Sequence, residues 1–288
     1  MSCLRSQPDR QFPKRIVAIQ HIRKMRGGAQ SHLMRCSDEN FYVVKFCNNP
    51  QHTRVLANEM LATRLAEEAW LPVPETALVS VDDWLVRHTP QLNIQLNHKT
   101  IDCQPGIHFG SKYVVSPLVG QVFDYLPINM LSRVRNVAAF AGMLAMDKWI
   151  CNVDIRQAAF WRSRRERRYH VSFIDQGWAF NAGEWTFPDA PMRGVYEHDA
   201  VYKDIRGWQS FEPWLSRIER MNADVIWTIG KMIPKEWYGA TEDLEALVEA
   251  LLQRRSRVRD LIACCRRSRK RSFPLWADER SDMGNTAS

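Results

Sequence analysis

The order of apolar and polar positions predicts strands in the first half of the chain and helices in the second. Alternating or continuous β-branched and aromatic residues indicate strands at 16–25, 33–36, 41–46, 76–79, 84–86, 113–115 and 121–126. One helix is expected among them, over 53–70, and the step Leu71-Pro72 would end it. From residue 128 onward the pattern predicts helices over 137–146, 213–221, 222–232 and 241–263. The sequence therefore predicts an α+β fold with a β-rich N-terminal lobe and a mainly helical C-terminal lobe.

Two segments lack such periodicity. Residues 89–112 are polar and contain proline and glycine, so we expect a loop there. Residues 266–288 form a basic-to-polar tail that we expect to be disordered.

A polar cluster directly follows the apolar run Val137–Met146, which itself predicts a buried helix. It contains Asp147, Asn152, Asp154, Arg156 and Gln157. If strands over 158–162 and 169–174 pair as a hairpin, Asp154 and Asp175 come together at one end of the sheet. There one carboxylate could orient or accept the proton of an attacking hydroxyl, while the other holds a magnesium ion on a nucleotide phosphate. Ordinary solvated charges on a surface hairpin are the alternative.

Three further features lie earlier in the chain. The adjacent Gly27 and Gly28 sit in a turn whose backbone N–H groups could cradle phosphate oxygens, although a plain hairpin turn explains them as well. Lys45 shares a strand face with Phe41 and Val43, and an ammonium buried there needs an anionic partner, whereas one on a face open to solvent does not. Glu59 lies on the small apolar stripe of the helix over 53–70. The pattern predicts that Lys45 and Glu59 form an ion pair that positions a phosphate-binding lysine.

Composition narrows the class of protein. The net charge of +8 is concentrated in arginine-rich segments at 162–168 and 254–271, which suit nucleic acid, anionic lipid or acidic protein, or simply a solvated face. The longest apolar run is too short to cross a bilayer, and the first fifteen residues lack the apolar core of a secretory signal, so we expect a cytoplasmic protein without a membrane partner. The seven cysteines contain no metal-type pair and are expected to be reduced.

Taken in order, the glycine turn, strand lysine, helix glutamate, acidic loop and Asp-x-Gly turn follow the order of protein-kinase-like folds. The segment Gly27-Gly28-Ala29-Gln30 resembles the Gly-Gly-Ala-Gln turn of the HipA-like kinase family, and 150–154 resembles its Ile-Gly-Asn-Thr-Asp motif. The similarity extends over residues 16–260. It implies a two-lobed protein-kinase-like fold that uses ATP and Mg²⁺ to transfer the γ-phosphoryl group to a hydroxyl, with protein serine or threonine as the acceptor.

The resemblance also implies roles for single residues. Lys45 would bind the nucleotide phosphates with support from Glu59, Asp154 would be the catalytic base, and Asp175 would bind magnesium. The nucleotide-binding set would further contain Gly27, Gly28, Ala29, Gln30, Ser31, Asn152 and Gln157. The family loop continues Asp-x-His-x-x-Asn, whereas this chain reads Asp154-Ile155-Arg156-Gln157, so Gln157 would replace the metal-binding asparagine. A catalytically impaired nucleotide-binding regulator, or a nucleic-acid-binding protein that uses the arginine clusters, are the alternatives.

Asp147 competes with Asp154 for the role of base. Asn152 follows Asp147 by five residues, a spacing typical of the catalytic aspartate and metal-binding asparagine of kinase-like loops. Asp147 nevertheless continues the apolar helix, whereas Asp154 precedes the strand that emerges into the cleft. Because a base must lie within about 3 Å of the attacking hydroxyl, the pattern favours Asp154.

The interpretation divides the chain into four parts. They are an N-terminal extension over 1–15, a β-rich nucleotide-binding lobe over 16–120, a helical lobe with the catalytic hairpin over 121–265, and the tail over 266–288.

Overall fold

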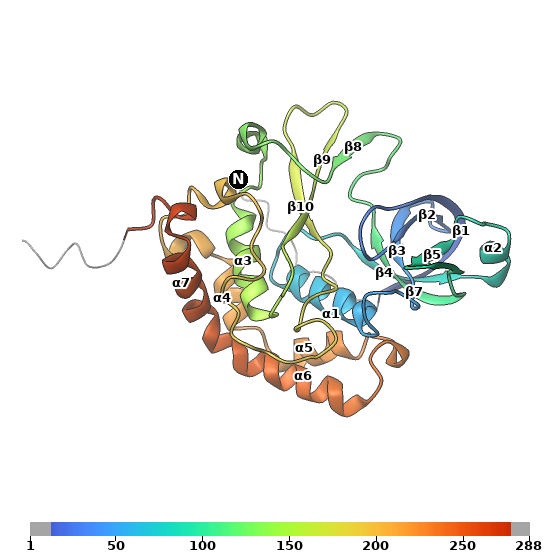
Figure 1. Cartoon of the computed structure of the whole chain (residues 1–288). Helices are drawn as coiled ribbons and strands as arrows, with labels where there is room; N and C mark the ends of the chain where they lie inside the picture. Colours follow the sequence, from blue (N-terminus) through green and yellow to red (C-terminus); the bar gives the residue numbers. More distant parts are fainter. Residues whose placement is uncertain (1–12, 278–288) are drawn as a thin grey trace, which may run out of the picture.

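The computed structural model describes residues 13–277, and its first part is a closed five-stranded barrel (Figure 1). The strands follow the order β1-β2-β3-β7-β4, and the parallel pairing of β1 with β4 closes the barrel. Their bounds are β1 Lys14–Lys24, β2 His32–Cys36, β3 Phe41–Lys45, β4 Thr76–Val81 and β7 Gly106–Lys112. In β1, Ile16 and Ala18 are buried while the intervening Val17 is exposed, as expected for a strand with one face on a core.

The expected loop over 89–112 is wrong, because this segment supplies three strands. The strands β5 (Asn93–Leu96) and β6 (Lys99–Asp102) form a two-stranded flap, and β7 is a central strand of the barrel that pairs with both β3 and β4. At Gly110 an added Cβ would lie 2.4 Å from Cγ2 of Val79 on the neighbouring strand β4, so any larger residue would force Val79 out of its place in the barrel core. Gly110 has no side chain, and His108 is polar although it is buried. The segment therefore lacks the apolar pattern by which a strand is predicted.

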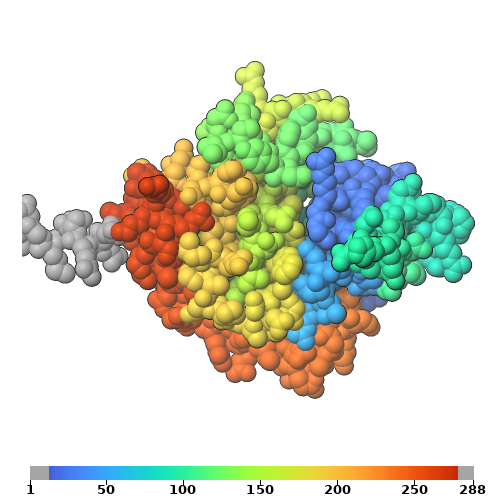
Figure 2. Space-filling model, viewed as in Figure 1, coloured from blue at the N-terminus to red at the C-terminus, as the bar shows by residue number. Residues whose placement is uncertain are grey.

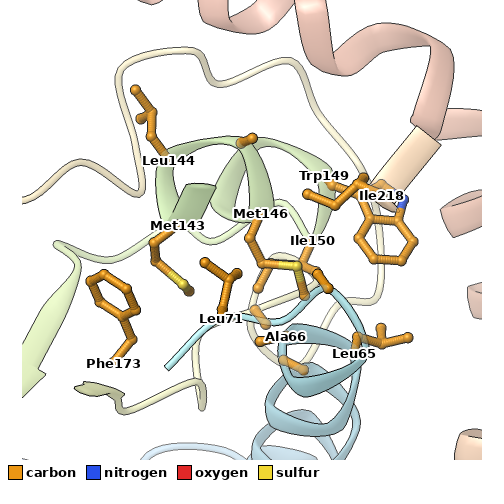
Figure 3. Close-up of a cluster of buried hydrophobic side chains, with 14 of the residues drawn as sticks. Leu65, Ala66, Leu71, Met143, Leu144, Met146, Trp149, Ile150, Phe173 and Ile218 are labelled. Atoms are coloured by element: carbon orange, nitrogen blue, oxygen red, sulfur yellow. The ribbon is translucent and has the colours of Figure 1, made fainter. Parts of the chain in front are cut away.

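The helix α1 (Val55–Glu68) lies between the barrel and the helical part of the molecule (Figure 1). It is buried on nearly all sides because it contacts both β4 and β7 of the barrel and, on the other side, the helix α5 (Ala223–Gly230) and the 3₁₀ helix η4 (Lys235–Trp237). Figure 3 shows Leu65 and Ala66 of α1 beside Met146 and Ile150, which lie in and directly after the helix over Ala139–Trp149. One apolar core therefore extends from the barrel side of α1 into the C-terminal part.

A second sheet follows the barrel, with the order β10-β9-β8. It consists of β8 Gly120–Phe123, β9 Gln157–Ser163 and β10 His170–Ile174. The pairing of β9 with β10 confirms the predicted hairpin. The helix α3 (Ala139–Trp149) is buried along its whole length, which confirms the buried helix expected over 137–146.

Among the remaining helices, α4 and α7 pack against α3, and α5 packs against α6. They are α4 Trp214–Glu219, α5 Ala223–Gly230, α6 Thr241–Arg254 and α7 Val258–Ser268, with α2 Asp83–Arg87 on the barrel and 3₁₀ turns at Ile128–Arg133, Asp199–Tyr202, Trp208–Phe211, Lys235–Trp237, Arg255–Arg257 and Lys270–Ser272. The single helix expected over 241–263 is interrupted at Arg255–Arg257. None of the described helices is long and apolar enough to span a bilayer.

Both expected ends need correction. Lys14 and Arg15 already belong to β1, so the N-terminal extension is shorter than predicted, and residues 1–12 lie outside the described part. The expectation of disorder from residue 266 is wrong up to 277, because Phe273 is buried and Trp276 packs against Trp208 and Phe211. Aromatic side chains thus pack this segment against the helical part, although its many basic residues suggested disorder. Residues 278–288 lie outside the described residues. The division at residue 120 stays a prediction.

The barrel interior contains two histidines that are fully buried, His32 and His108. Burial is the main cause that lowers the pKa of each to about 4, against an ordinary value of 6.5. His108 Nδ1 accepts a hydrogen bond from the backbone N–H of Cys47. Because the unfolded chain binds protons on these residues at a higher pH than the folded chain, the stability of the barrel is full above pH 6.5 and falls as the pH drops toward 4.

We therefore expect His108→Asn to reduce the acid sensitivity of the fold. The asparagine Oδ1 can still accept from Cys47, but it does not titrate. In urea unfolding at about pH 7 and about pH 4.5, the wild-type protein should lose on the order of 2 kcal/mol for each buried histidine, and the variant about half of the total. The exposed His98→Asn is the control and should behave as wild type. An unchanged pH dependence of the His108→Asn variant would refute this account.

Candidate active site

A cleft of about 720 Å³ lies between the barrel and the second sheet. Its walls come from the turn after β1, the end of β3, α1, β7, β8 and the open end of the β9–β10 hairpin. In Figure 1 these elements meet between the blue barrel and the green-to-yellow strands. The volume is in the range of small-molecule and cofactor sites.

Lys45 lies at the centre of this cleft, between two carboxylates. Its Nζ donates to Glu59 Oε1 at 2.5 Å and to Asp175 Oδ1 at 2.7 Å. The Lys45 and Glu59 side chains are 8% and 3% exposed, whereas Asp175 is 20% exposed toward the cleft. The structure thus confirms the predicted Lys45–Glu59 ion pair and adds Asp175 to it.

The electrostatics of the three groups follow from this arrangement. Burial alone would lower the pKa of Lys45, but the charges of Asp175 and Glu59 outweigh it and leave the pKa raised. Burial raises the pKa of Glu59 in spite of Lys45. Burial also works to raise the pKa of Asp175, but Lys45 outweighs it and leaves the pKa lowered. At neutral pH the site therefore holds an ammonium and a carboxylate facing the cleft.

The turn after β10 is shaped by Asp175 and Gly177. Asp175 adopts a positive φ of 60°, which aims its carboxylate back at Lys45. A Cβ on Gly177 would lie 2.8 Å from Val55 Cγ2 and 3.3 Å from Glu59 Oε1. Glycine is therefore required for the turn to pack against α1 beside the ion pair.

The segment that follows this turn is bound to α1 by Asn58. The Asn58 Nδ2 donates to the carbonyl oxygens of Gly177, Ala179 and Ala182 at 2.8–2.9 Å. Its Oδ1 accepts from Trp185 Nε1 at 2.7 Å, and the residue is fully buried. Asn58 was not among the predicted site residues. An amide next to Glu59, in a run that is otherwise apolar from Val55 to Ala62, was the available signal.

Arg156 connects the acidic loop with the turn after β10. Its guanidinium contacts both carboxylate oxygens of Asp147, through Nη2 at 2.7 Å and Nε at 3.0 Å. It also donates to the carbonyl oxygen of Ile174 at 2.8 Å and to Gln176 Oε1 at 3.0 Å. Arg156 and Asp147 have side chains that are 1% and 0% exposed, so this pair is internal. Sequence reasoning noted Arg156 but gave it no role; an arginine at the start of an apolar strand was the signal.

Asp154 and Asp147 therefore occupy different environments. Asp147 lies in the last turn of α3 and is enclosed by Arg156 and Asn152. Asp154 lines the cleft and lies in no ion pair in the described residues. The Asp154 backbone N–H donates to Asn152 Oδ1 at 3.1 Å, which fixes the loop. The arrangement leaves Asp154 as the carboxylate that a substrate in the cleft can reach.

The structure places most of the predicted site residues in the cleft lining. These are Gly27, Gly28, Ala29, Ser31, Lys45, Glu59, Asp154, Gln157 and Asp175. Asn152 is not in this set, because it is 3% exposed and its amide binds Asp147 and the Asp154 backbone. Gln30 is not either, because its amide pairs with the backbone N–H and C=O of Gln95 in β5, each at 2.7 Å. Both residues order loops of the cleft and do not face it.

The donor set fits a nucleotide phosphate with a divalent cation. Gln157 pairs in register with Ile174, so its exposed side chain begins beside Asp175 at the end of the hairpin. A carboxylate and an amide oxygen are ligands that Mg²⁺ accepts, and the cation keeps several waters in such sites. Gln51, which sequence reasoning missed, also lines the cleft near Gly28, and its Oε1 has no partner in the described residues.

The opposite rim of the cleft consists of different residues. Asp124 and Tyr125, which follow β8, line it together with Ile155 and Glu197. Tyr125 and Ile155 are 52% and 60% exposed, so an apolar surface lies beside Asp154. Such half-open, mixed surfaces suit a large substrate that enters from outside.

Comparisons with known proteins agree with this geometry. A model of the HipA-like kinase family matches residues 16–268. A kinase of Helicobacter pylori, the proinflammatory kinase CtkA, aligns at a TM-score of 0.58 and 13% identity over 86% of this chain and 96% of the kinase. Hydra Fam20, solved with sugar, aligns at a TM-score of 0.52 and 10% identity over 92% of this chain and 90% of Fam20.

These structures are similar to this chain in fold. A search of curated proteins gives no match. The match to the family model covers most of the chain and includes the glycine turn, Lys45, Asp154 and Asp175. The chain therefore belongs to the HipA-like kinase family and is a phosphotransferase with a protein-kinase-like fold.

Proposed function

We propose that the protein transfers the γ-phosphoryl group of ATP, with Mg²⁺, to a serine or threonine hydroxyl of a protein. The observation that carries this proposal is the Lys45 ammonium held between Glu59 and Asp175 at the centre of the cleft. Phosphoryl transfer needs positioning and charge stabilisation more than covalent chemistry. A fixed cation beside a glycine turn, with a carboxylate facing the same space, supplies both.

Each residue then has one task. Lys45 binds the phosphate oxygens, and Glu59 keeps its ammonium in place because a buried lysine without a partner would be costly. The backbone N–H groups at Gly27 and Gly28 provide further donors near the phosphates. Asp175 and Gln157 would hold Mg²⁺, which when bound neutralises charge on the phosphates.

Asp154 completes the transfer. Its carboxylate orients the acceptor hydroxyl and takes its proton as the new O–P bond forms and the bond between phosphorus and the ADP oxygen breaks. The Asn152 amide and the Arg156–Asp147 pair hold the loop that positions it. The half-open rim at Tyr125 and Ile155 supports a protein acceptor, because it leaves room for the chain on either side of the hydroxyl.

A thermal-shift assay tests the nucleotide and metal parts of the proposal. ATP with Mg²⁺ at about ten times its dissociation constant should stabilise the wild-type protein by about 1.4 kcal/mol, or about 3 °C. In the Asp175→Asn protein, ATP should give the same smaller shift with and without Mg²⁺. Asp204→Asn, at an exposed position away from the cleft lining, is the control. A full metal-dependent shift in the Asp175→Asn protein would contradict the role of Asp175.

The pair Asp154→Asn and Asp147→Asn separates chemistry from stability. Asp154→Asn should lower the rate of phosphoryl transfer by about 10²-fold or more while the free energy of unfolding changes by less than about 0.5 kcal/mol. Asp147→Asn removes the charge that faces buried Arg156 and should cost about 3 kcal/mol. Radiolabelled phosphate transfer to a protein mixture and urea unfolding measure the two quantities. Wild-type transfer by Asp154→Asn, with none by a folded Asp147→Asn protein, would reverse the assignment.

A further inference from the structure

The turn between β9 and β10 carries a dense positive charge at the end of the hairpin remote from Asp154. It contains four exposed arginines, Arg164, Arg165, Arg167 and Arg168, whose side chains make no hydrogen bond or ion pair with residues 13–277. The neighbouring Glu166 offsets only one of these four charges, and its carboxylate contacts the Ser163 backbone N–H and His170 rather than an arginine. We call these four arginines the arginine tip. Four like charges in five residues repel one another unless an anion binds them.

Two exposed aliphatic residues lie directly beside the arginine tip. Leu118 and Val119 are 72% and 57% exposed, and the Arg164 backbone N–H donates to the Val119 carbonyl oxygen at 3.1 Å. Figure 2 shows this segment and the hairpin together at one end of the molecule. The surface thus combines unpaired guanidinium groups with apolar side chains.

This combination favours an acidic polypeptide over a nucleic acid. Proteins that bind single-stranded nucleic acid use exposed aromatic rings on which bases stack. Here Trp161 is stacked on His170, and Tyr169 is buried beneath Arg162. Guanidinium groups instead match carboxylates in bidentate geometry, and Leu118 and Val119 offer contacts to apolar side chains of the same segment.

The strand β8 connects the arginine tip with the cleft. It is the edge strand of its sheet, so among the described strands only β9 pairs with it. Leu118 and Val119 precede β8, and Asp124 and Tyr125 follow it into the cleft lining. From Gln157 to Ser163 the hairpin extends about 20 Å, which six or seven residues of extended chain would span.

We propose that the arginine tip, with Leu118 and Val119, is a docking surface for an acidic, extended segment of the protein acceptor. The segment lies along β8, and its glutamate or aspartate residues stand about six to eight positions from the phosphorylated hydroxyl. This inference rests on the proposed function, since it assumes a polypeptide acceptor. It assigns the selection of substrate to a surface outside the catalytic residues.

A peptide array provides the test. Peptides with a central serine or threonine carry glutamate, alanine or lysine at each position up to about eight on either side. The wild-type protein should phosphorylate peptides with distant glutamates about fivefold more efficiently than those with lysines, and this ratio should fall at high salt. The variant with Arg164, Arg165, Arg167 and Arg168 changed to serine should show a ratio near one with the same ATP-dependent thermal shift.

A matched variant removes four other exposed positive charges from the helical lobe, Lys203→Ser, Arg206→Ser, Arg267→Ser and Arg271→Ser, and should keep the wild-type ratio. Leu118→Ser with Val119→Ser should lower the efficiency for all acidic peptides. If the wild-type protein shows no preference for distant glutamate, or the tip variant keeps the preference, the inference is wrong while the proposed function stands.

Binding without turnover separates the two proposals. A dye-labelled dodecapeptide of glutamate and leucine should bind the wild-type protein in fluorescence polarisation and lose that binding in the tip variant. If no peptide is phosphorylated but this binding is present, the proposed protein acceptor fails, and the arginine tip binds acidic polypeptide without selecting a substrate. Absence of peptide binding, or tighter tip-dependent binding of a single-stranded RNA or of vesicles containing phosphatidylserine, overturns the inference.

Discussion

The candidate active site depends on two hydrogen bonds that the Lys45 ammonium donates to the carboxylates of Glu59 and Asp175. The three residues come from three different elements of the fold. Glu59 comes from the helix between the two parts of the molecule, and Asp175 comes from the end of the second sheet, while Lys45 belongs to the barrel. A buried ammonium must have such partners. Its burial therefore holds three separate elements at one point, and the cleft forms around that point.

A second buried charge pair lies behind the first. Both side chains of the Arg156–Asp147 pair are buried, and a buried ion pair contributes little to the net stability of a fold. The pair instead fixes the positions of two loops. Arg156 reaches the carbonyl of Ile174 and the Gln176 side chain, so the loop before β9 and the turn after β10 share one anchor. The two carboxylates that the proposed mechanism needs are thereby held in a fixed relation to each other.

The sequence predicted the parts of the site that follow from local periodicity. Lys45 and Glu59 were found because a strand face and a helix stripe both point inward, and the hairpin followed from two strands with a basic turn. The strand β7 was missed because two of its inward positions are occupied by Gly110 and the buried His108. Neither residue contributes to the apolar pattern by which a strand is predicted. Gln30 and Asn152 were assigned to the nucleotide because they lie in motifs that resemble those of the HipA-like kinase family. Their actual partners, Gln95 and Asp147, depend on tertiary contacts that no local pattern contains.

The hydrogen bonds of Asn58 have a consequence for control of the enzyme. Many kinase-like proteins are switched off when the helix that carries the glutamate swings outward and the segment after the metal-binding turn rearranges. In this chain a single buried amide joins that helix to three carbonyl groups of that segment. Neither can leave without exposing unsatisfied polar groups of the other. The helix α1 and residues 177–182 are therefore coupled, so a change in the position of one must change the position of the other.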